Sequence, residues 1–103
     1  MDRIAALNEV LAQNPNDTFA RYGLAMEYSK QGDFERSLEE FSTLLKNHPD
    51  YVPGYFMAAQ TLVRADRTAE AKTMLTDGIS SARRTGNMHA LSEMESMLGE
   101  LQA

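Results

Sequence analysis

The side chains most able to support metal binding or acid–base catalysis are two histidines, His48 and His89. Neither belongs to a His-x3-His or Glu-x2-His spacing, which would put two ligands on one helix face, so no metal site is predicted. His89 lies about 140° around its predicted helix from Met94, which does not favour a shared copper site. His48 precedes Pro49 at a helix end, where a cation favours the helix dipole, and this indicates a structural role.

Carboxylates and hydroxyls are present but lack the neighbours that catalysis needs. Glu35, Glu39 and Glu40 fall on one predicted helix, where they form a charged face rather than a buried acid with a raised pKa. Ser80 and Ser81 have no histidine base close by in the sequence. The chain has no cysteine and no glycine-rich phosphate-binding loop. The sequence therefore predicts a protein that is not an enzyme and that binds no metal or cofactor.

Length and composition limit the remaining possibilities. The 103 residues are enough for one domain, and 43% hydrophobic with 24% charged residues is too apolar a composition for a disordered chain. No apolar run approaches the roughly 20 residues that span a bilayer, and the start lacks a signal-peptide pattern. The net charge of −5 disfavours nucleic acid and anionic membranes. We expect a cytoplasmic protein, and Met1 favours a complete chain.

Apolar residues recur with the period of an α-helix along the chain. Ile4, Leu7 and Leu11 form one stripe at about 100° per residue, and Phe34 and Leu38 begin another. No segment shows the sustained alternation that is typical of a half-buried strand. The helical periodicity and the missing strand pattern together predict an all-α fold. Proline, glycine and aspartate interrupt the helical pattern and divide it into six segments. The six predicted helices span residues 3–13, 17–31, 34–47, 51–65, 68–84 and 87–101.

Four aspartates stand at the predicted starts of helices: Asp17, Asp33, Asp50 and Asp66. An aspartate at the N-cap accepts a hydrogen bond from a free amide of the first turn, and its charge suits the helix dipole. We therefore predict that each of these four side chains caps a helix.

The sequence matches itself when it is shifted by 34 residues. The shift aligns Tyr22 with Phe56 and Ala25 with Ala59. This period and the helix–turn–helix unit are similar to the tetratricopeptide repeat, whose pattern is W-x2-L-G-x2-Y followed by A-x3-F. The matching strings are Arg21-x2-Leu24-Ala25-x2-Tyr28 with Ser37-x3-Phe41, and Tyr55-x2-Ala58-Ala59-x2-Leu62 with Ala71-x3-Leu75.

The resemblance implies one domain, residues 1–103, folded as a right-handed α-solenoid of antiparallel helix pairs. Its expected parts are a half-repeat at 1–17, full repeats at 18–51 and 52–85, and a C-terminal capping helix at 86–103. A cap with one polar face closes a stack of repeats.

Some positions agree with the family pattern and others depart from it. Small residues such as Ala25 and Ser37 let helices approach closely, while the large Phe41 fills the space between them. Arg21 stands where the pattern has a large apolar residue. Arg83 replaces the closing proline, which predicts that the fifth helix continues past the usual end.

A second apolar stripe lies on the predicted helix at 17–31. Phe19, Tyr22 and Met26 fall within about 60° of one another, away from the stripe that packs in the repeat. In tetratricopeptide proteins these first-helix positions line a concave groove, and Arg64 beside it could receive an acidic partner tail. The resemblance thus predicts a groove formed by Phe19, Tyr22, Met26, Phe56, Gln60, Val63, Arg64 and Met94.

The predicted function is that of a non-catalytic protein–protein interaction module that binds a peptide or helix in this groove. The carboxylate clamp of chaperone-binding relatives is not expected, because Tyr22 and Met26 occupy the matching positions of the first repeat. Two alternatives use the same residues. A second copy could fill the groove and give a homodimer or stack, or the first and last helices could fold across the row and make it core.

Overall fold

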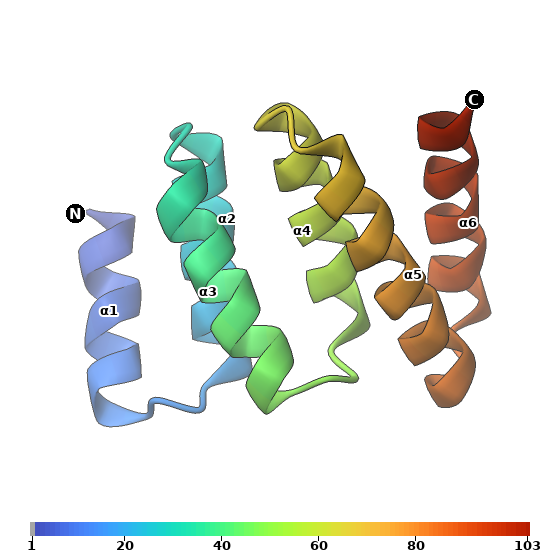
Figure 1. The fold of residues 1–103 in the computed structure, drawn as a ribbon. Helices are drawn as coiled ribbons and strands as arrows, with labels where there is room; N and C mark the ends of the chain where they lie inside the picture. The colour runs from blue at the N-terminus through green and yellow to red at the C-terminus, as the bar shows by residue number, and fades with distance from the viewer. Residues whose placement is uncertain (1) are drawn as a thin grey trace.

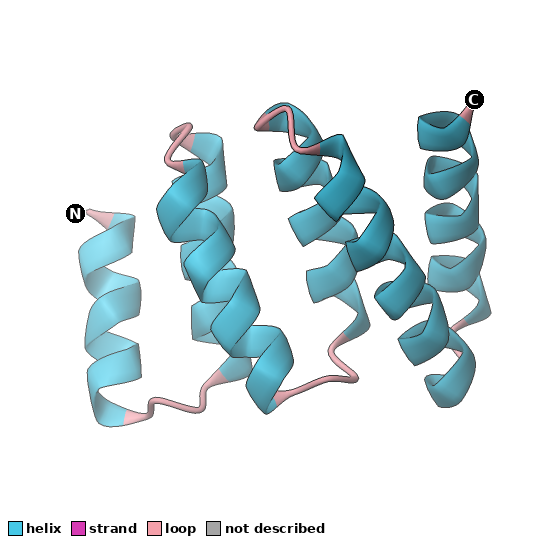
Figure 2. Ribbon diagram, viewed as in Figure 1, coloured by secondary structure: helices cyan, strands magenta, loops and turns pink. Residues whose placement is uncertain are grey.

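The computed structural model describes residues 2–103, and within this range it contains six α-helices and no strand (Figures 1 and 2). The prediction of an all-α fold is therefore confirmed, and every predicted helix boundary lies within one residue of the observed one. The helices are α1 (Arg3–Gln13), α2 (Thr18–Lys30), α3 (Phe34–Asn47), α4 (Val52–Arg64), α5 (Thr68–Thr85) and α6 (Met88–Gln102).

The helices form two rows. Helix α2 contacts α4, and α4 contacts α6, whereas within residues 2–103 the helices α1, α3 and α5 contact only members of the other row. In Figure 1, α3 and α5 lie toward the viewer, with α2 and α4 behind them. The molecule measures 41 × 29 × 19 Å, so it is an elongated stack of helix pairs. We call α2, α4 and α6 the inner row, and α1, α3 and α5 the outer row.

Apolar side chains form three clusters along the stack. One lies between α1 and α2, the next joins α2, α3 and α4, and the last joins the end of α3 to α4, α5 and α6. Ala25, Ser37 and Phe41 are fully buried, as the packing pattern predicts. The Ser37 hydroxyl donates a 2.7 Å hydrogen bond to the Ala25 carbonyl where α2 and α3 approach. Stability therefore depends on contacts between neighbouring helices, as expected for a helical solenoid.

Helix capping agrees with the sequence at two of the four aspartates. The carboxylates of Asp17 and Asp33 accept hydrogen bonds from the amides of Ala20 and Arg36. The prediction was wrong for Asp66, which precedes the N-cap of α5 and adopts a positive φ of 62°, at the turn position that Gly32 occupies in the preceding hairpin. The N-cap residue is Arg67, whose side chain has no hydrogen-bond acceptor, so α5 begins without a side-chain cap.

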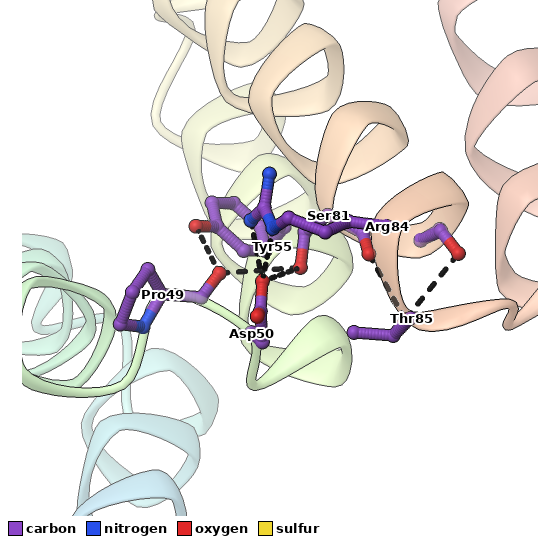
Figure 3. A network of polar contacts seen from close by, with 7 residues as sticks. Pro49, Asp50, Tyr55, Ser81, Arg84 and Thr85 are labelled. Carbon is purple, nitrogen blue, oxygen red and sulfur yellow. Dashed lines mark hydrogen bonds and ion pairs between the residues drawn. The ribbon is translucent and has the colours of Figure 1, made fainter.

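The prediction was also wrong for Asp50, which joins two helix pairs instead of capping α4. Its Oδ1 accepts hydrogen bonds from Ser81 at 3.1 Å and from Arg84 Nε at 2.9 Å, both on α5 (Figure 3). The neighbouring carbonyl of Pro49 accepts hydrogen bonds from Tyr55 at 2.6 Å and from Ser81 at 3.2 Å. These contacts fix the loop between α3 and α4 against the end of α5.

Replacing Asp50 with asparagine is expected to lower the melting temperature at neutral pH and to have less effect in acid. The hydrogen bond from Arg84, together with that from Ser81, lowers the pKa of the Asp50 carboxyl. A carboxyl whose pKa is lowered by folding stabilises the protein above its ordinary pKa, and the contribution is lost as pH falls through the folded-state value. Circular dichroism melts from neutral pH to about pH 2 measure this. A melting-temperature difference that stays constant across the range would contradict the assignment.

Arg21 stands where the family pattern has a large apolar residue, and polar contacts hold its side chain there. Its guanidinium lies 2.7 Å from the Glu40 carboxylate and donates a 3.0 Å hydrogen bond to the carbonyl of Pro15. Both side chains of the ion pair are largely shielded from solvent, so the pair links α2 to α3 without leaving an unpaired buried charge. The departure from the family pattern at Arg21 is therefore compatible with close packing.

Candidate functional site

Three pockets lie side by side along the inner row, with volumes of about 430, 270 and 530 Å³. The first lies between α2 and α4, the second is lined by Tyr22 of α2 together with α4 and the start of α6, and the third lies between α4 and α6. Gln60 lines the first and third pockets, and Phe56 lines the second and third, so the three adjoin one another. We call this row of adjoining pockets the inner groove.

Helix α2 contributes Tyr22 and Met26 to the inner groove. Its Asp17 cap fixes the start of the helix, so that Tyr22 and Met26, four residues apart, fall on the same face. Tyr22 lines the second pocket and Met26 the first. Phe19, one turn earlier, is 74% exposed and lines none of the three pockets. The prediction that Phe19 lines the groove was therefore wrong, and this ring is a large solvent-exposed side chain outside the three pockets.

Tyr22 belongs partly to the core and partly to the groove. Its ring centroid lies 6.4 Å from that of Phe41 and 5.4 Å from that of Tyr51. Burial raises the pKa of the Tyr22 hydroxyl, and the neighbouring Tyr51 adds to the shift. A substitution at Tyr22 would therefore change both folding and the groove surface.

Helix α4 forms the floor of the inner groove. Phe56 and Gln60 are half-buried, and each faces two pockets. Val63 lines none of these pockets and packs against the cluster shared by α4, α5 and α6. Of the predicted α4 residues, the structure thus brings Phe56, Gln60 and Arg64 to the groove and leaves Val63 outside it.

Arg64 lies at the edge of the first pocket, where neighbouring groups already hold it. Its guanidinium donates a 3.1 Å hydrogen bond to Ser29 and lies 5.2 Å from the ring centroid of Phe34. The Ser29 hydroxyl also lies 2.9 Å from that of Thr61, so α2 and α4 are joined here by buried polar contacts. Arg64 is a fixed positive charge at one end of the groove.

The prediction that Met94 lines the groove was wrong. Met94 is fully buried, and its sulfur lies close to Gly78 of α5. Helix α5 continues to Thr85, as Arg83 predicted, and α6 begins 36 residues after α4 where α4 begins 34 after α2. The longer spacing rotates α6 relative to a strict repeat and turns Met94 into the core.

Sequence reasoning missed most of the groove wall that α6 provides. The wall consists largely of small and acidic side chains, which a helical pattern assigns to a solvated face. Only Ala90 and Met97 carried an apolar signal. The α6 residues that line the second and third pockets are His89, Ala90, Ser92, Glu93, Ser96, Met97 and Glu100.

Neither terminal helix covers the inner groove. Helix α6 packs against α5 and α4 and forms a wall, and α1 packs against α2. The pockets between α4 and α6 are open, and Met26 is only partly buried. The alternative in which the apolar row becomes core therefore applies to Met94, and in part to Val63, which packs against the cluster of α4, α5 and α6.

A separate pocket of about 550 Å³ lies in the outer row between α3 and α5. Its floor includes the buried Phe41 and Leu62 and the half-buried Met74, and its rim carries Arg67 and Glu70, which pair with each other. Lys46 and Asp77 also line this pocket, so it combines an apolar floor with charged groups at its rim.

The groups with catalytic potential are dispersed. Among residues 2–103, no three acidic or histidine side chains gather at a site that could hold a metal ion. His48 caps the C-terminus of α3 through its backbone, and His89 lies 3.3 Å from Glu93. Glu35 lies 3.7 Å from Arg67, the N-cap residue of α5. In the same range, no helix has the length and apolar character needed to cross a bilayer.

Comparison with known proteins identifies the repeat. Two tetratricopeptide repeat models match the chain, over residues 1–54 and 28–94. A TPR repeat-containing protein of Pseudomonas aeruginosa is 28% identical over 98 residues, which cover 95% of this chain and 93% of that protein. The solution structure of a tetratricopeptide repeat domain protein from Salinibacter ruber is 35% identical, covers 85% of this chain and 89% of its own, and has a TM-score of 0.80.

A more distant structure shares the fold. It is the type III secretion chaperone SycD of Yersinia enterocolitica in complex with a peptide of the translocator YopD, 18% identical over 96% of this chain and 76% of that one, with a TM-score of 0.86. The matches to both repeat models, the paired helices and the 34-residue period agree with one another. The chain belongs to the tetratricopeptide repeat family.

Proposed function

We propose that this chain is a non-catalytic protein–protein interaction module that binds a peptide or helix of a partner in the inner groove. The observation that carries the proposal is the row of three adjoining pockets lined by half-buried Tyr22, Met26 and Phe56. Partly exposed aromatic and methionine side chains in a groove are typical of interface cores. The SycD–peptide complex gives the proposal a precedent on the same fold.

The whole stack serves this function. Repeats 18–51 and 52–85 present the groove floor, the half-repeat at 1–17 supports α2, and the capping helix at 86–103 completes the wall. A carboxylate clamp is not part of the proposal, because the first-repeat positions carry Tyr22 and Met26, which have no cationic group. The net charge of −5 disfavours nucleic acid and anionic membranes as partners, and we place the module in the cytoplasm.

Peptides selected by display on the immobilised chain are expected to bind the inner groove. Phe56→Ala should weaken their binding by at least about tenfold. The Phe56 ring lines two pockets, and truncating a central aromatic residue of an interface typically removes a large part of the binding energy. Isothermal titration calorimetry measures the affinity, and the heat-capacity change should be negative because apolar surface is buried.

Met74→Ala is the matched control, since Met74 is also half-buried but lines the outer pocket. Circular dichroism should show that both variants remain helical. Loss of affinity in Met74→Ala but not in Phe56→Ala would place the peptide on the outer row and overturn the proposal.

Self-association is a second candidate function, favoured by the 74% exposure of Phe19. Light scattering behind size exclusion distinguishes the two. A mass that stays near 11.5 kDa as concentration rises supports a foreign partner. A mass that approaches twice this value in the wild type but not in Phe19→Ser would instead make the chain a homodimer.

A further inference from the structure

The two ends of the inner groove carry opposite charge. The pocket between α2 and α4 is lined by the cations of Lys30 and Arg64, and its one carboxylate, Glu27, lies 3.4 Å from Arg3. The third pocket, of about 530 Å³ between α4 and α6, contains no lysine or arginine and is lined by Glu93 and Glu100. A bound segment therefore meets an electrostatic gradient along the groove.

The α6 end also combines charge with an apolar floor. Phe56 and Met97, both half-buried, lie in the same pocket as the exposed carboxylates of Glu93 and Glu100. Ser92 and Ser96, short side chains on this face, add hydroxyl oxygens. Carboxylates only accept hydrogen bonds, so the pocket has an excess of acceptors over an aromatic surface.

The carboxylates of this pocket are available to a ligand. Glu93 has one partner, His89, at 3.3 Å, and this contact is an ion pair only when the imidazole is protonated. Glu100 has no ion-pair partner among residues 2–103. Glu95 of the same helix differs, because Arg83 lies 3.4 Å away and it lines none of the groove pockets.

We propose that the partner segment carries a lysine or arginine next to a large apolar side chain, and that both side chains bind in the third pocket, between α4 and α6. The cation pairs with Glu93 or Glu100, which lie two turns apart on α6, and the apolar neighbour rests on Phe56 and Met97. This inference rests on the proposed function and adds the chemistry of the partner. This cation and the acidic tail expected at Arg64 would occupy opposite ends of the groove.

Two capped synthetic peptides test the inference. They share the same leucine and phenylalanine residues and differ only in carrying lysine or glutamate beside them. Fluorescence anisotropy with the wild-type chain at low salt should show that the lysine peptide binds at least about tenfold more tightly. The double variant Glu93→Gln and Glu100→Gln should weaken the lysine peptide about tenfold, and added salt should reduce the difference between the peptides.

The matched control is the double variant Glu9→Gln and Glu39→Gln, which removes the same charge at exposed positions of α1 and α3 outside the groove. Retained binding of the lysine peptide in this control supports a local effect. Equal weakening by both double variants would mean that the preference for the lysine peptide comes from the net charge of the chain and not from Glu93 and Glu100, and would overturn the inference.

Phe56→Ala separates this inference from the proposed function. If the glutamate peptide binds as tightly as the lysine peptide and Phe56→Ala weakens both, the groove binds peptides and the charge inference is wrong. If neither peptide responds to Phe56→Ala, both the inference and the groove assignment fail for these ligands.

Discussion

Replacing Phe41 with alanine is expected to lower the free energy of unfolding by about 3–5 kcal/mol. Phe41 is fully buried in the cluster that joins α2, α3 and α4, and its ring lies edge-on to Tyr22. Truncation would remove apolar contacts and leave a cavity that the helices cannot fully close. Because domains of this size are stable by about 5–15 kcal/mol, the loss is a large fraction of the total. Urea unfolding followed by circular dichroism measures it.

The same substitution at Phe19 is the control, because that ring is 74% exposed. Phe19→Ala should change stability by no more than about 0.5 kcal/mol. Similar losses in both variants would mean that Phe19 is buried in solution, either by another part of the chain or by a second copy.

Adding one methyl group at Gly78 is expected to destabilise the junction of α4, α5 and α6. A Cβ atom there would lie 2.6 Å from the Cβ of Tyr55 and 2.6 Å from the sulfur of Met94, which is too close for either. Met94 has a flexible side chain, but the Tyr55 Cβ is attached to the backbone, so helices must move apart. We expect Gly78→Ala to cost about 1–3 kcal/mol despite the better helix propensity of alanine.

Gly99→Ala in α6 isolates the packing effect. A Cβ atom at Gly99 meets no other atom within 4 Å, so this variant should gain about 0.5–1 kcal/mol from helix propensity alone. Thermal and urea unfolding of the pair should therefore shift in opposite directions. Stabilisation by both substitutions would show that α5 and α6 do not approach each other closely at Gly78.

The fold could be predicted because its determinants are local or periodic. Helical periodicity and turn residues located all six helices, and the 34-residue shift identified the repeat. Asp17 and Asp33 cap helices because the amides of a first helical turn have no partner within the helix. Asp50 looks identical in the sequence, but Ser81 and Arg84 compete for its carboxylate from 31 and 34 residues away.

The candidate site was only partly predictable. Tyr22, Met26, Phe56, Gln60 and Arg64 follow from the repeat register, and the structure brings all five to the inner groove. The α6 wall did not follow, because its orientation depends on how far α5 continues before the chain turns.

The buried Met94 and the groove-facing Glu93 are adjacent residues with opposite environments. A rotation of α6 by one residue would exchange them. Such a rotation depends on packing at Gly78, which no pattern within α6 reports.

Mapping where a bound peptide contacts the chain shows directly whether partners bind in the inner groove. Backbone amide shifts of isotope-labelled protein would be followed during titration with the tightest peptide from display selection. We predict that the largest shifts cluster on α2, α4 and α6, at residues that line the three pockets, with α3 and α5 little affected. Shifts concentrated around Met74 and the outer pocket, or spread evenly over the molecule, would contradict the assignment of the inner groove as the binding surface.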